Sequence, residues 1–208
     1  MGDAALLLRW TGTARDGDPA MVEAAYRSVR RARLRGVVDV VPAPASVLVR
    51  FDPSRVSAKH LRQALPTLVR QPGTVKRSKA HTIGVRYGGE AGPDLEEVAH
   101  RLRLSQDQVI GLHQGAEYTV LATGFAPGFV YLGPLPPALR LPRREDPRIS
   151  VPAGSVAIAD ALSGVYGVRS GGGWWLIGRT EIPTFDPNRM PPTPFGIGRR
   201  IRFRSVGR

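Results

Sequence analysis

The chain has 208 residues, of which 42% are hydrophobic and 23% are charged, and its formal net charge is +13. These values favour one large or two small globular domains and exclude wholesale disorder. The chain has no cysteine, which excludes disulfides and thiolate metal sites. It also has no run of about 18 apolar residues, which excludes a membrane-spanning helix. We therefore expect a cytoplasmic protein that does not interact with a membrane.

The positive charge comes almost entirely from arginine, and most of the excess lies in the first part of the chain. Residues 1–80 carry 15 basic and 6 acidic side chains. Such a surface can attract nucleic acid or an acidic protein. No interleaving of aromatic and basic residues typical of a base-stacking surface accompanies the charge. The sequence therefore does not favour nucleic acid as a partner.

Residues 1–79 predict a small α+β domain that begins with a strand at residues 4–10. Asp18 and Pro19 are typical of a helix start, with the aspartate as the cap and the proline at the first helical position. Apolar residues then recur at helical spacing. We expect Gly36 to end this helix.

Two β-rich runs, residues 37–41 and 47–51, predict a strand pair in the same domain. The prolines between them, at 42–44, should turn the chain because proline cannot donate to a strand ladder. Ser57 is predicted to cap a second helix. Pro66 should end or kink that helix.

A polar stretch at residues 71–79 interrupts the hydrophobic pattern and is typical of a linker. We therefore expect a second domain at residues 80–208. It should begin with a strand at 81–87 and a helix starting at Pro93 and Asp94.

Ser105 and Gln108 have the spacing of a capping box for another short helix. The rest of the chain predicts a mainly β barrel or sandwich, because short strand-like runs alternate with Gly and Pro turns. These runs are residues 117–125, 155–159, 164–168, 174–178 and 201–206.

The sequence contains no Walker loop, dinucleotide glycine fingerprint, zinc-protease motif or serine-hydrolase motif. Its histidines fall on different predicted elements and lack metal-ligand spacing, so we expect no metal site within the chain. These histidines are His60, His81, His100 and His113.

Four loop motifs in the second domain could carry binding chemistry. Residues 124–133 combine glycine, proline and three aromatic rings, which can line a pocket or form a buried aromatic plug. Prolines flank arginines at 142–148, where guanidinium groups could clamp a carboxylate or phosphate or lie unengaged on the surface. Residues 151–156 place a hydroxyl where a loop enters a strand, a position suited to an oxyanion contact. Residues 171–180 fit either a binding loop or a hairpin with a core tryptophan.

If a barrel brings these loops together, they form one cleft. The candidate substrate-binding residues are Phe125, Pro127, Gly128, Phe129, Tyr131, Arg143, Arg148, Ser155, Trp174, Arg179 and Thr180.

Together these motifs resemble a family that includes the B subunit of ATP-dependent 5-oxoprolinase, allophanate hydrolase subunit 1 and KipI-type kinase inhibitors. This is the family of carboxyltransferase-domain subdomains C and D, and the resemblance implies that the chain and its partner subunit are together similar to the corresponding subdomains of urea carboxylase. The chain departs from the family pattern at Gly84 and Gly167, where the family has proline. The resemblance is carried by residues 39–42, 47–49, 52–53, 81–83, 85–90, 92–99, 125–133, 142–143, 147–148, 151–156, 172–180 and 185–187.

The resemblance implies an α+β N-terminal domain and a cyclophilin-like β-barrel C-terminal domain. It also implies a second cyclophilin-like subunit, of the type found as the C subunit of 5-oxoprolinase or as allophanate hydrolase subunit 2, and a third, lactam-hydrolase-like subunit. The implied activity is the ATP-dependent opening of 5-oxoproline to glutamate. ATP would bind at a site shared with or supplied by the partners, and the chain alone would be inactive. Allophanate hydrolysis and inhibition of a sensor histidine kinase are the alternatives.

Overall fold

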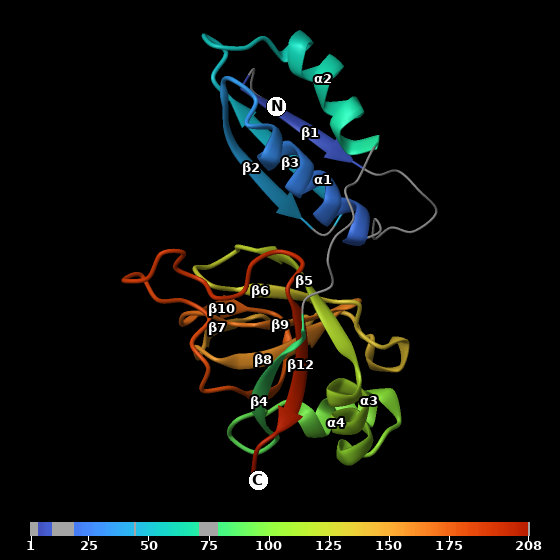
Figure 1. Cartoon of the computed structure of the whole chain (residues 1–208). Coiled ribbons are helices and arrows are strands. Elements are labelled where there is room, and N and C mark those ends of the chain that lie inside the picture. The colour runs from blue at the N-terminus through green and yellow to red at the C-terminus, as the bar shows by residue number, and fades with distance from the viewer. Residues whose placement is uncertain (1–3, 10–18, 44, 71–78, 208) are drawn as a thin grey trace. The chain divides into compact units, whose positions relative to one another are not determined.

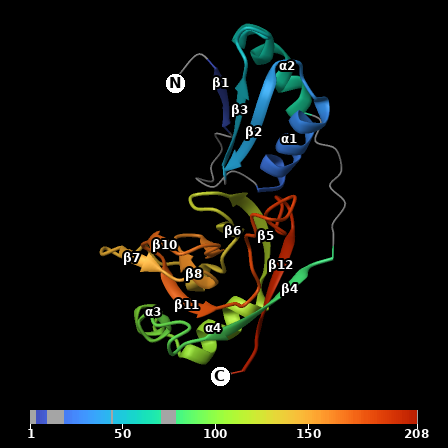
Figure 2. The ribbon, with the colours of Figure 1, turned by 90° about the vertical axis from the view of Figure 1, so that its left-hand side faces the viewer.

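The computed structural model describes residues 4–9, 19–43, 45–70 and 79–207. The chain divides into two compact units, residues 1–77 and 78–208 (Figures 1 and 2). Residues 71–78 of the predicted linker lie outside the described residues, as do Asp18 and Trp10.

The first unit is an antiparallel sheet of strand order β1-β3-β2 with two helices packed on one face. Alternate residues of β3, namely Val47, Val49 and Phe51, are buried against the helices because side chains of a strand point to opposite faces in turn. The prediction of an α+β unit is confirmed. Its elements are β1 Ala5–Arg9, α1 Pro19–Ala32, β2 Val37–Ala43, β3 Ser46–Phe51 and α2 Ala58–Arg70.

The first helix ends earlier than the sequence predicts. It stops at Ala32, and Arg33 takes a left-handed conformation with a φ of 43°. Gly36 instead precedes β2, with a φ of 81°. A side chain at Gly36 would collide with Val56, which explains why glycine is required there.

Pro42 and Pro66 interrupt their secondary-structure elements less than the sequence predicts. Pro42 lies within β2 and pairs with Val47, which is possible because β2 is an edge strand. The second helix continues for a turn beyond Pro66, whose side chain is exposed. Ser57 caps this helix as predicted, since its hydroxyl accepts a hydrogen bond from the His60 N–H at 3.2 Å.

The second unit contains a closed seven-stranded barrel of order β11-β4-β12-β5-β6-β9-β8. All neighbouring strands pair antiparallel except β12 and β4, which are parallel. A separate ribbon is formed by β7 and β10. The elements are β4 His81–Tyr87, α3 Leu95–Leu102, α4 Gln106–Gly115, β5 Glu117–Thr123, β6 Val130–Gly133, η1 Pro137–Leu139, β7 Arg148–Val151, β8 Ser155–Ala159, β9 Leu162–Val165, β10 Ser170–Gly172, β11 Trp175–Arg179 and β12 Arg200–Ser205.

The prediction of a mainly β barrel is confirmed, and so are the strand at 81–87 and the capping box of Ser105 and Gln108. Sequence reasoning missed three short strands and a 3-10 helix. β6 follows an irregular glycine- and proline-containing loop, β7 lies between two prolines, and β10 is mostly glycine, so none shows the usual alternation of a strand. The 3-10 helix η1 has prolines on and before its first residue.

The barrel wall has a hydrophobic cluster on each side. In β8, Val156 and Ile158 belong to the main core, whereas Ala157 and Ala159 belong to a second cluster with Phe129. Every residue of β8 is therefore buried. The β5–β6 loop and the loop before β12 lie at the end of the barrel opposite α3 and α4 (Figures 1 and 2).

Candidate functional site

Four of the predicted site residues meet in one aromatic cluster. The ring of Phe129 makes edge-to-face contacts with Phe125 at 5.6 Å, Tyr131 at 4.7 Å and Trp174 at 5.5 Å between centroids. Tyr166, which the sequence analysis did not select, contacts the same ring at 4.9 Å. Phe129, Tyr166 and Trp174 are buried, but Phe125 is 67% exposed. Only the outer part of this cluster can therefore touch another molecule.

Three loops are pressed together beside the aromatic cluster. At Gly128, which has a φ of 70°, a side chain would collide with Phe185. The Thr184 hydroxyl donates a hydrogen bond to the Gly128 carbonyl at 2.8 Å. A side chain at Gly167 would collide with the Pro127 carbonyl. Glycine is needed at both positions because backbone approaches backbone without room for a Cβ atom.

Arg148 forms an ion pair with a buried carboxylate of the same chain, that of Asp94. Its two terminal nitrogens donate to the two carboxylate oxygens of Asp94 at 2.9 and 2.6 Å. Arg144 and the Leu176 N–H donate to the same carboxylate at 3.2 and 2.7 Å. Asp94 is buried, and such a bidentate pair with a buried carboxylate fixes the guanidinium rigidly. We call Asp94, Arg144 and Arg148 the Asp94 cluster.

Ser155, Arg179 and Thr180 lie together where β8 pairs with β11, because Arg179 is opposite Ser155. Ser155 and Thr180 are buried. Arg179 is exposed, and its Nε donates to the Ala153 carbonyl at 3.2 Å. The Ser155 carbonyl accepts a hydrogen bond from the Tyr166 N–H at 3.0 Å, so this group adjoins the aromatic cluster.

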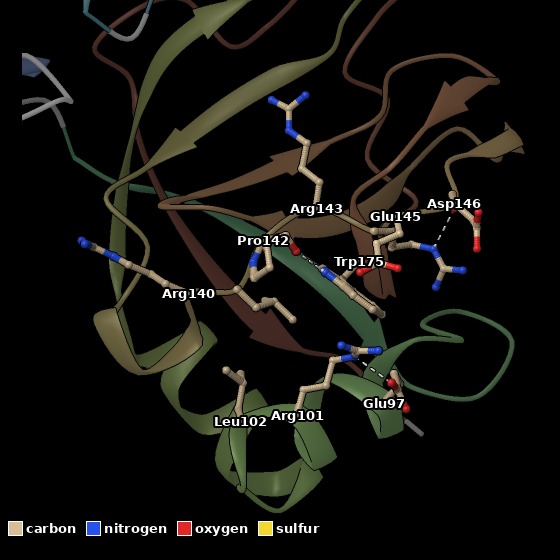
Figure 3. A pocket seen from close by; sticks show the side chains of 11 residues that line it. Glu97, Arg101, Leu102, Arg140, Pro142, Arg143, Glu145, Asp146 and Trp175 are labelled. Atoms are coloured by element: carbon tan, nitrogen blue, oxygen red, sulfur yellow. Dashed lines mark hydrogen bonds and ion pairs between the residues drawn. The ribbon is translucent and has the colours of Figure 1, made fainter.

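An open cavity of about 670 Å³ lies between α3 and residues 140–146. Trp175 forms one wall and donates from Nε1 to the Pro142 carbonyl at 2.7 Å. The guanidinium carbons of Arg101 and Arg144 lie 5.0 and 5.1 Å from the Trp175 ring centroid. Of the predicted site residues, only Arg143 lines this cavity (Figure 3).

The cavity carries charges of both signs. Arg101 is paired with Glu97 at 2.7 Å, and Arg143 is paired with Asp160 at 3.4 Å. Figure 3 shows the guanidinium groups of Arg140 and Arg143 pointing away from the tryptophan. Arg140 and Arg143 therefore do not converge with Arg101 and Arg144 on one point, as a four-arginine clamp for a small anion would require.

A histidine lies inside the barrel but has no access to solvent. Nδ1 of His113 is 2.8 Å from the Tyr87 hydroxyl, and Nε2 is 2.9 Å from the Ser163 hydroxyl. Because Ser163 donates to the Ala157 carbonyl, it accepts from Nε2–H, and Tyr87 donates to Nδ1. Burial lowers the pKa of His113 to about 3, so the ring is neutral. Tyr87, His113 and Ser163 therefore form a buried hydrogen-bond network with a structural role.

Sequence reasoning missed Tyr166 and the role of Asp94. The sequence predicts a helix start at Pro93 and Asp94. Asp94 lies at the N-cap position of α3, but its side chain makes no capping hydrogen bond and pairs with arginine instead. An acidic residue with two arginines about 50 positions later carries no local signal of pairing. Burial raises the pKa of Tyr166 and Tyr131 above the usual value for tyrosine, while Arg143 opposes the rise for both.

Within residues 4–9, 19–43, 45–70 and 79–207, no group of three or more His, Asp or Glu side chains is arranged to hold a metal ion. In the same residues, no helix combines the length and the apolar character needed to cross a membrane.

The sequence and the fold were compared with known proteins, and both have clear relatives. Residues 1–195 match the family described as "Carboxyltransferase domain, subdomain C and D". The chain is 36% identical over 219 aligned residues to the B subunit of 5-oxoprolinase from Bacillus subtilis (strain 168), which covers 98% of this chain and 90% of that protein. It is 50% identical over 121 residues to the protein of the same name from Escherichia coli O157:H7, covering 58% and 56% of the two chains.

Among solved structures, TTHA0988 superimposes with a TM-score of 0.84 at 37% sequence identity. The match covers 98% of this chain but 40% of the TTHA0988 chain. The same fold thus occurs there within a considerably longer polypeptide.

Proposed function

Because the chain belongs to the family of carboxyltransferase-domain subdomains C and D, we propose that it is a subunit of a heteromeric, ATP-dependent 5-oxoprolinase. The complex would convert 5-oxo-L-proline to L-glutamate, and ATP hydrolysis would supply the free energy for opening the lactam. The observation that carries this proposal is the 36% identity to the B subunit of a 5-oxoprolinase over 98% of the chain, which includes both units.

The chemistry of the described residues supports a need for partner subunits. The buried carboxylate of Asp94 is occupied by two arginines, and the buried imidazole of His113 is enclosed in the barrel. Neither can act as an acid or base on a substrate in this arrangement, because neither has a free path to one.

The same reasoning applies to ATP. Phosphates commonly bind free amides at a helix N-terminus. At α4, the capping box already engages one of these amides, because the Gln108 N–H donates to the Ser105 hydroxyl at 3.1 Å. We therefore propose that ATP binds at a site shared with or supplied by a second, cyclophilin-like subunit and a third, lactam-hydrolase-like subunit, and that the chain alone is inactive.

We further propose a division of roles among the predicted site residues of the 80–208 domain. The exposed groups would contact substrate or partner, and the buried or partly buried ones would hold the loops that carry them. The first set is Phe125, Pro127, Arg143 and Arg179, and the second set is Gly128, Phe129, Tyr131, Arg148, Ser155, Trp174 and Thr180.

Reconstitution tests the function. The chain is mixed with candidate second and third subunits, and ATP-dependent glutamate release from 5-oxo-L-proline is measured with each component omitted in turn. We expect activity only in the full mixture. Arg143→Ala and Arg179→Ala should each lower kcat/KM about 10-fold, since each would remove a charge-assisted contact. Arg204→Ala, an exposed arginine on β12, is the matched control.

The proposed function would be contradicted if no mixture released glutamate under conditions in which a known set of 5-oxoprolinase subunits did. Allophanate is assayed in parallel, and ammonia release from it without glutamate release from 5-oxoproline would assign the alternative substrate.

A further inference from the structure

The cavity between α3 and residues 140–146 has the size of a small-molecule site. Its volume is about 670 Å³, within the range of about 300–1,000 Å³ that such sites occupy. Of the predicted site residues only Arg143 lines it, and the guanidinium group of Arg143 points away from the tryptophan wall (Figure 3). We call this space the Trp175 cavity. A ligand bound in it would lie apart from the aromatic cluster.

Two guanidinium groups of the Trp175 cavity keep unused donors. Arg101 and Arg144 both line the cavity, and their guanidinium carbons lie 5.0 and 5.1 Å from the tryptophan ring centroid. Arg101 donates from Nε to Glu97, and Arg144 donates from Nε and one terminal nitrogen to groups of the same chain. In the part of the chain that the structure describes, their remaining terminal nitrogens make no hydrogen bond. These nitrogens can donate to carboxylate oxygens of a ligand.

Two carboxylates on the facing side of the Trp175 cavity are also unused. Glu145 and Asp146 belong to the segment 140–146, whereas Arg101 belongs to α3 (Figure 3). Both acids are exposed, and neither carboxylate forms a hydrogen bond or ion pair with another described residue. Ionised carboxylates accept hydrogen bonds only, so they are suited to a ligand that carries an ammonium group.

The Trp175 cavity is therefore complementary to a zwitterion. The carboxylates of such a ligand would pair with Arg101 and Arg144, and its ammonium group would pair with Glu145 and Asp146. A purely anionic ligand would bring its charge towards two unpaired carboxylates, and like charges that face each other oppose binding. A purely cationic ligand would face the two guanidinium groups in the same way. Only a ligand with charges of both signs satisfies both sides.

We propose that the Trp175 cavity binds a free α-amino acid with a second carboxylate, and that this ligand is L-glutamate. The chemical class follows from the charges of the cavity, and the choice of glutamate rests on the proposed function, in which it is the product. The nitrogen of 5-oxo-L-proline is a lactam N–H and carries no positive charge. Opening the lactam creates both the ammonium group and the second carboxylate. The cavity would thus hold the product and discriminate against the substrate.

NMR titration of the purified chain tests the proposal without ATP or a partner subunit. The Trp175 indole N–H bonds to the Pro142 carbonyl in the cavity wall, so its signal should shift when L-glutamate is added. The indole signal of Trp174, in the aromatic cluster, should not shift. Trp175→Phe assigns the two signals. Because the contacts involve exposed charges, we expect a Kd of the order of 1 mM.

Ligands that lack one charge test the complementarity. Glutarate, which has both carboxylates but no ammonium group, and 5-oxo-L-proline should each bind about 5-fold more weakly than L-glutamate. The double variant Glu145→Gln, Asp146→Asn should raise the Kd of glutamate about 5-fold without weakening glutarate, so that the two ligands bind equally. Arg101→Gln should weaken both ligands about 5-fold. Glu96→Gln is the matched control, because Glu96 is an exposed acid of α3 that does not line the cavity.

Three results would overturn the inference. They are glutarate binding to the unmodified chain as tightly as glutamate, a shift of the Trp174 signal in place of the Trp175 signal, and no shift far above 1 mM glutamate. Each would leave the proposed function intact, because glutamate release by the reconstituted complex is measured separately. Binding of glutamate in the cavity without glutamate release by any reconstituted complex would instead count against the proposed function alone.

Discussion

The Asp94 cluster and the two loops that carry Phe125 and Met190 lie in the same barrel unit, but they differ in whether their side chains have partners within the chain. In the first, one buried carboxylate accepts four hydrogen bonds, from Arg144, from Arg148 and from the Leu176 N–H. In the second, a phenyl ring and a thioether side chain are left in solvent. The first region has satisfied its polar groups within the chain, and the second has apolar groups with nothing over them.

This difference shows why residue type alone does not identify a binding group. Arg148 and Arg179 both follow glycine- or proline-rich turns and are equally plausible as anion clamps in the sequence. One is committed to an internal acid and the other keeps its terminal nitrogens at the surface. The two arginines differ in the group that each one contacts, which is the Asp94 carboxylate for Arg148 and the Ala153 carbonyl for Arg179. These contacts are set by the fold and not by the neighbouring sequence.

The largest expected effect is from removing the acid of the Asp94 cluster. Asp94→Ala leaves two guanidinium groups without their carboxylate, and breaking a buried ion pair in this way costs about 3–5 kcal/mol. The free energy of unfolding from urea denaturation measures it. Arg204→Ala should change that energy by less than about 0.5 kcal/mol. Equal losses in the two variants would contradict the structural role of Asp94.

A second prediction concerns the stability of the folded chain at low pH. The pKa of His113 is about 3 in the folded chain, below its ordinary value of 6.5. Between these values the unfolded chain binds a proton that the folded chain does not, so stability falls as pH decreases below 6.5. At about 1.4 kcal/mol per pH unit, the loss reaches about 3 kcal/mol by pH 4.

Urea unfolding at pH 7 and pH 4 isolates this contribution when the chain is compared with His113→Gln. The variant should be less stable at pH 7 because the bonds to Tyr87 and Ser163 change. It should also lose less stability on acidification. Parallel pH profiles for the two proteins would rule out the histidine as the cause.

The contact between the loop of Gly167 and the loop of Pro127 and Gly128 gives a third prediction. Gly167→Ala places a methyl group against the Pro127 carbonyl and Gly128, and backbone cannot move aside as a side chain can. We expect a loss of about 2 kcal/mol. Gly111→Ala in α4 is the counterpart, because its Cβ position is open, and it should stabilise by about 0.5–1 kcal/mol. Thermal unfolding of the pair measures both.

The smallest effect on stability is expected at Arg179. Arg179→Ala should change the free energy of unfolding by less than about 0.5 kcal/mol, because the side chain is exposed and bonds only the Ala153 carbonyl. Arg148→Ala should cost about 3 kcal/mol, since it leaves the buried carboxylate of Asp94 without its bidentate partner. A melting curve of each variant separates the two classes of arginine. A large loss at Arg179 would remove the contrast between them.

The sequence could predict most of the regular elements. The strand at 81–87 alternates, and Ser105 with Gln108 makes a local capping signal, so both follow from neighbouring residues. The ribbon of β7 and β10 could not be foreseen, because three glycine-rich residues become a strand only when β7 lies beside them.

For the candidate site, the local sequence could indicate which loops contribute residues. It could not indicate which side chains contact one another in the fold. The aromatic cluster assembles from residues at 125–131 and 174, which the motifs contain. Tyr166 completes it from a third segment with no such motif. The pairing of Asp94 with Arg148 joins positions 54 residues apart, and such a contact has no periodicity to reveal it.

The position of β12 constrains how the barrel forms during synthesis. Residues 200–205 lie between β4 and β5, so these two earlier strands have no direct contact with each other along the wall. Until the ribosome has released residue 205, the wall must stay open and two strand edges remain available to other chains. Assembly of this barrel is therefore a late, long-range event, and nascent chains stalled before residue 200 should be prone to aggregation.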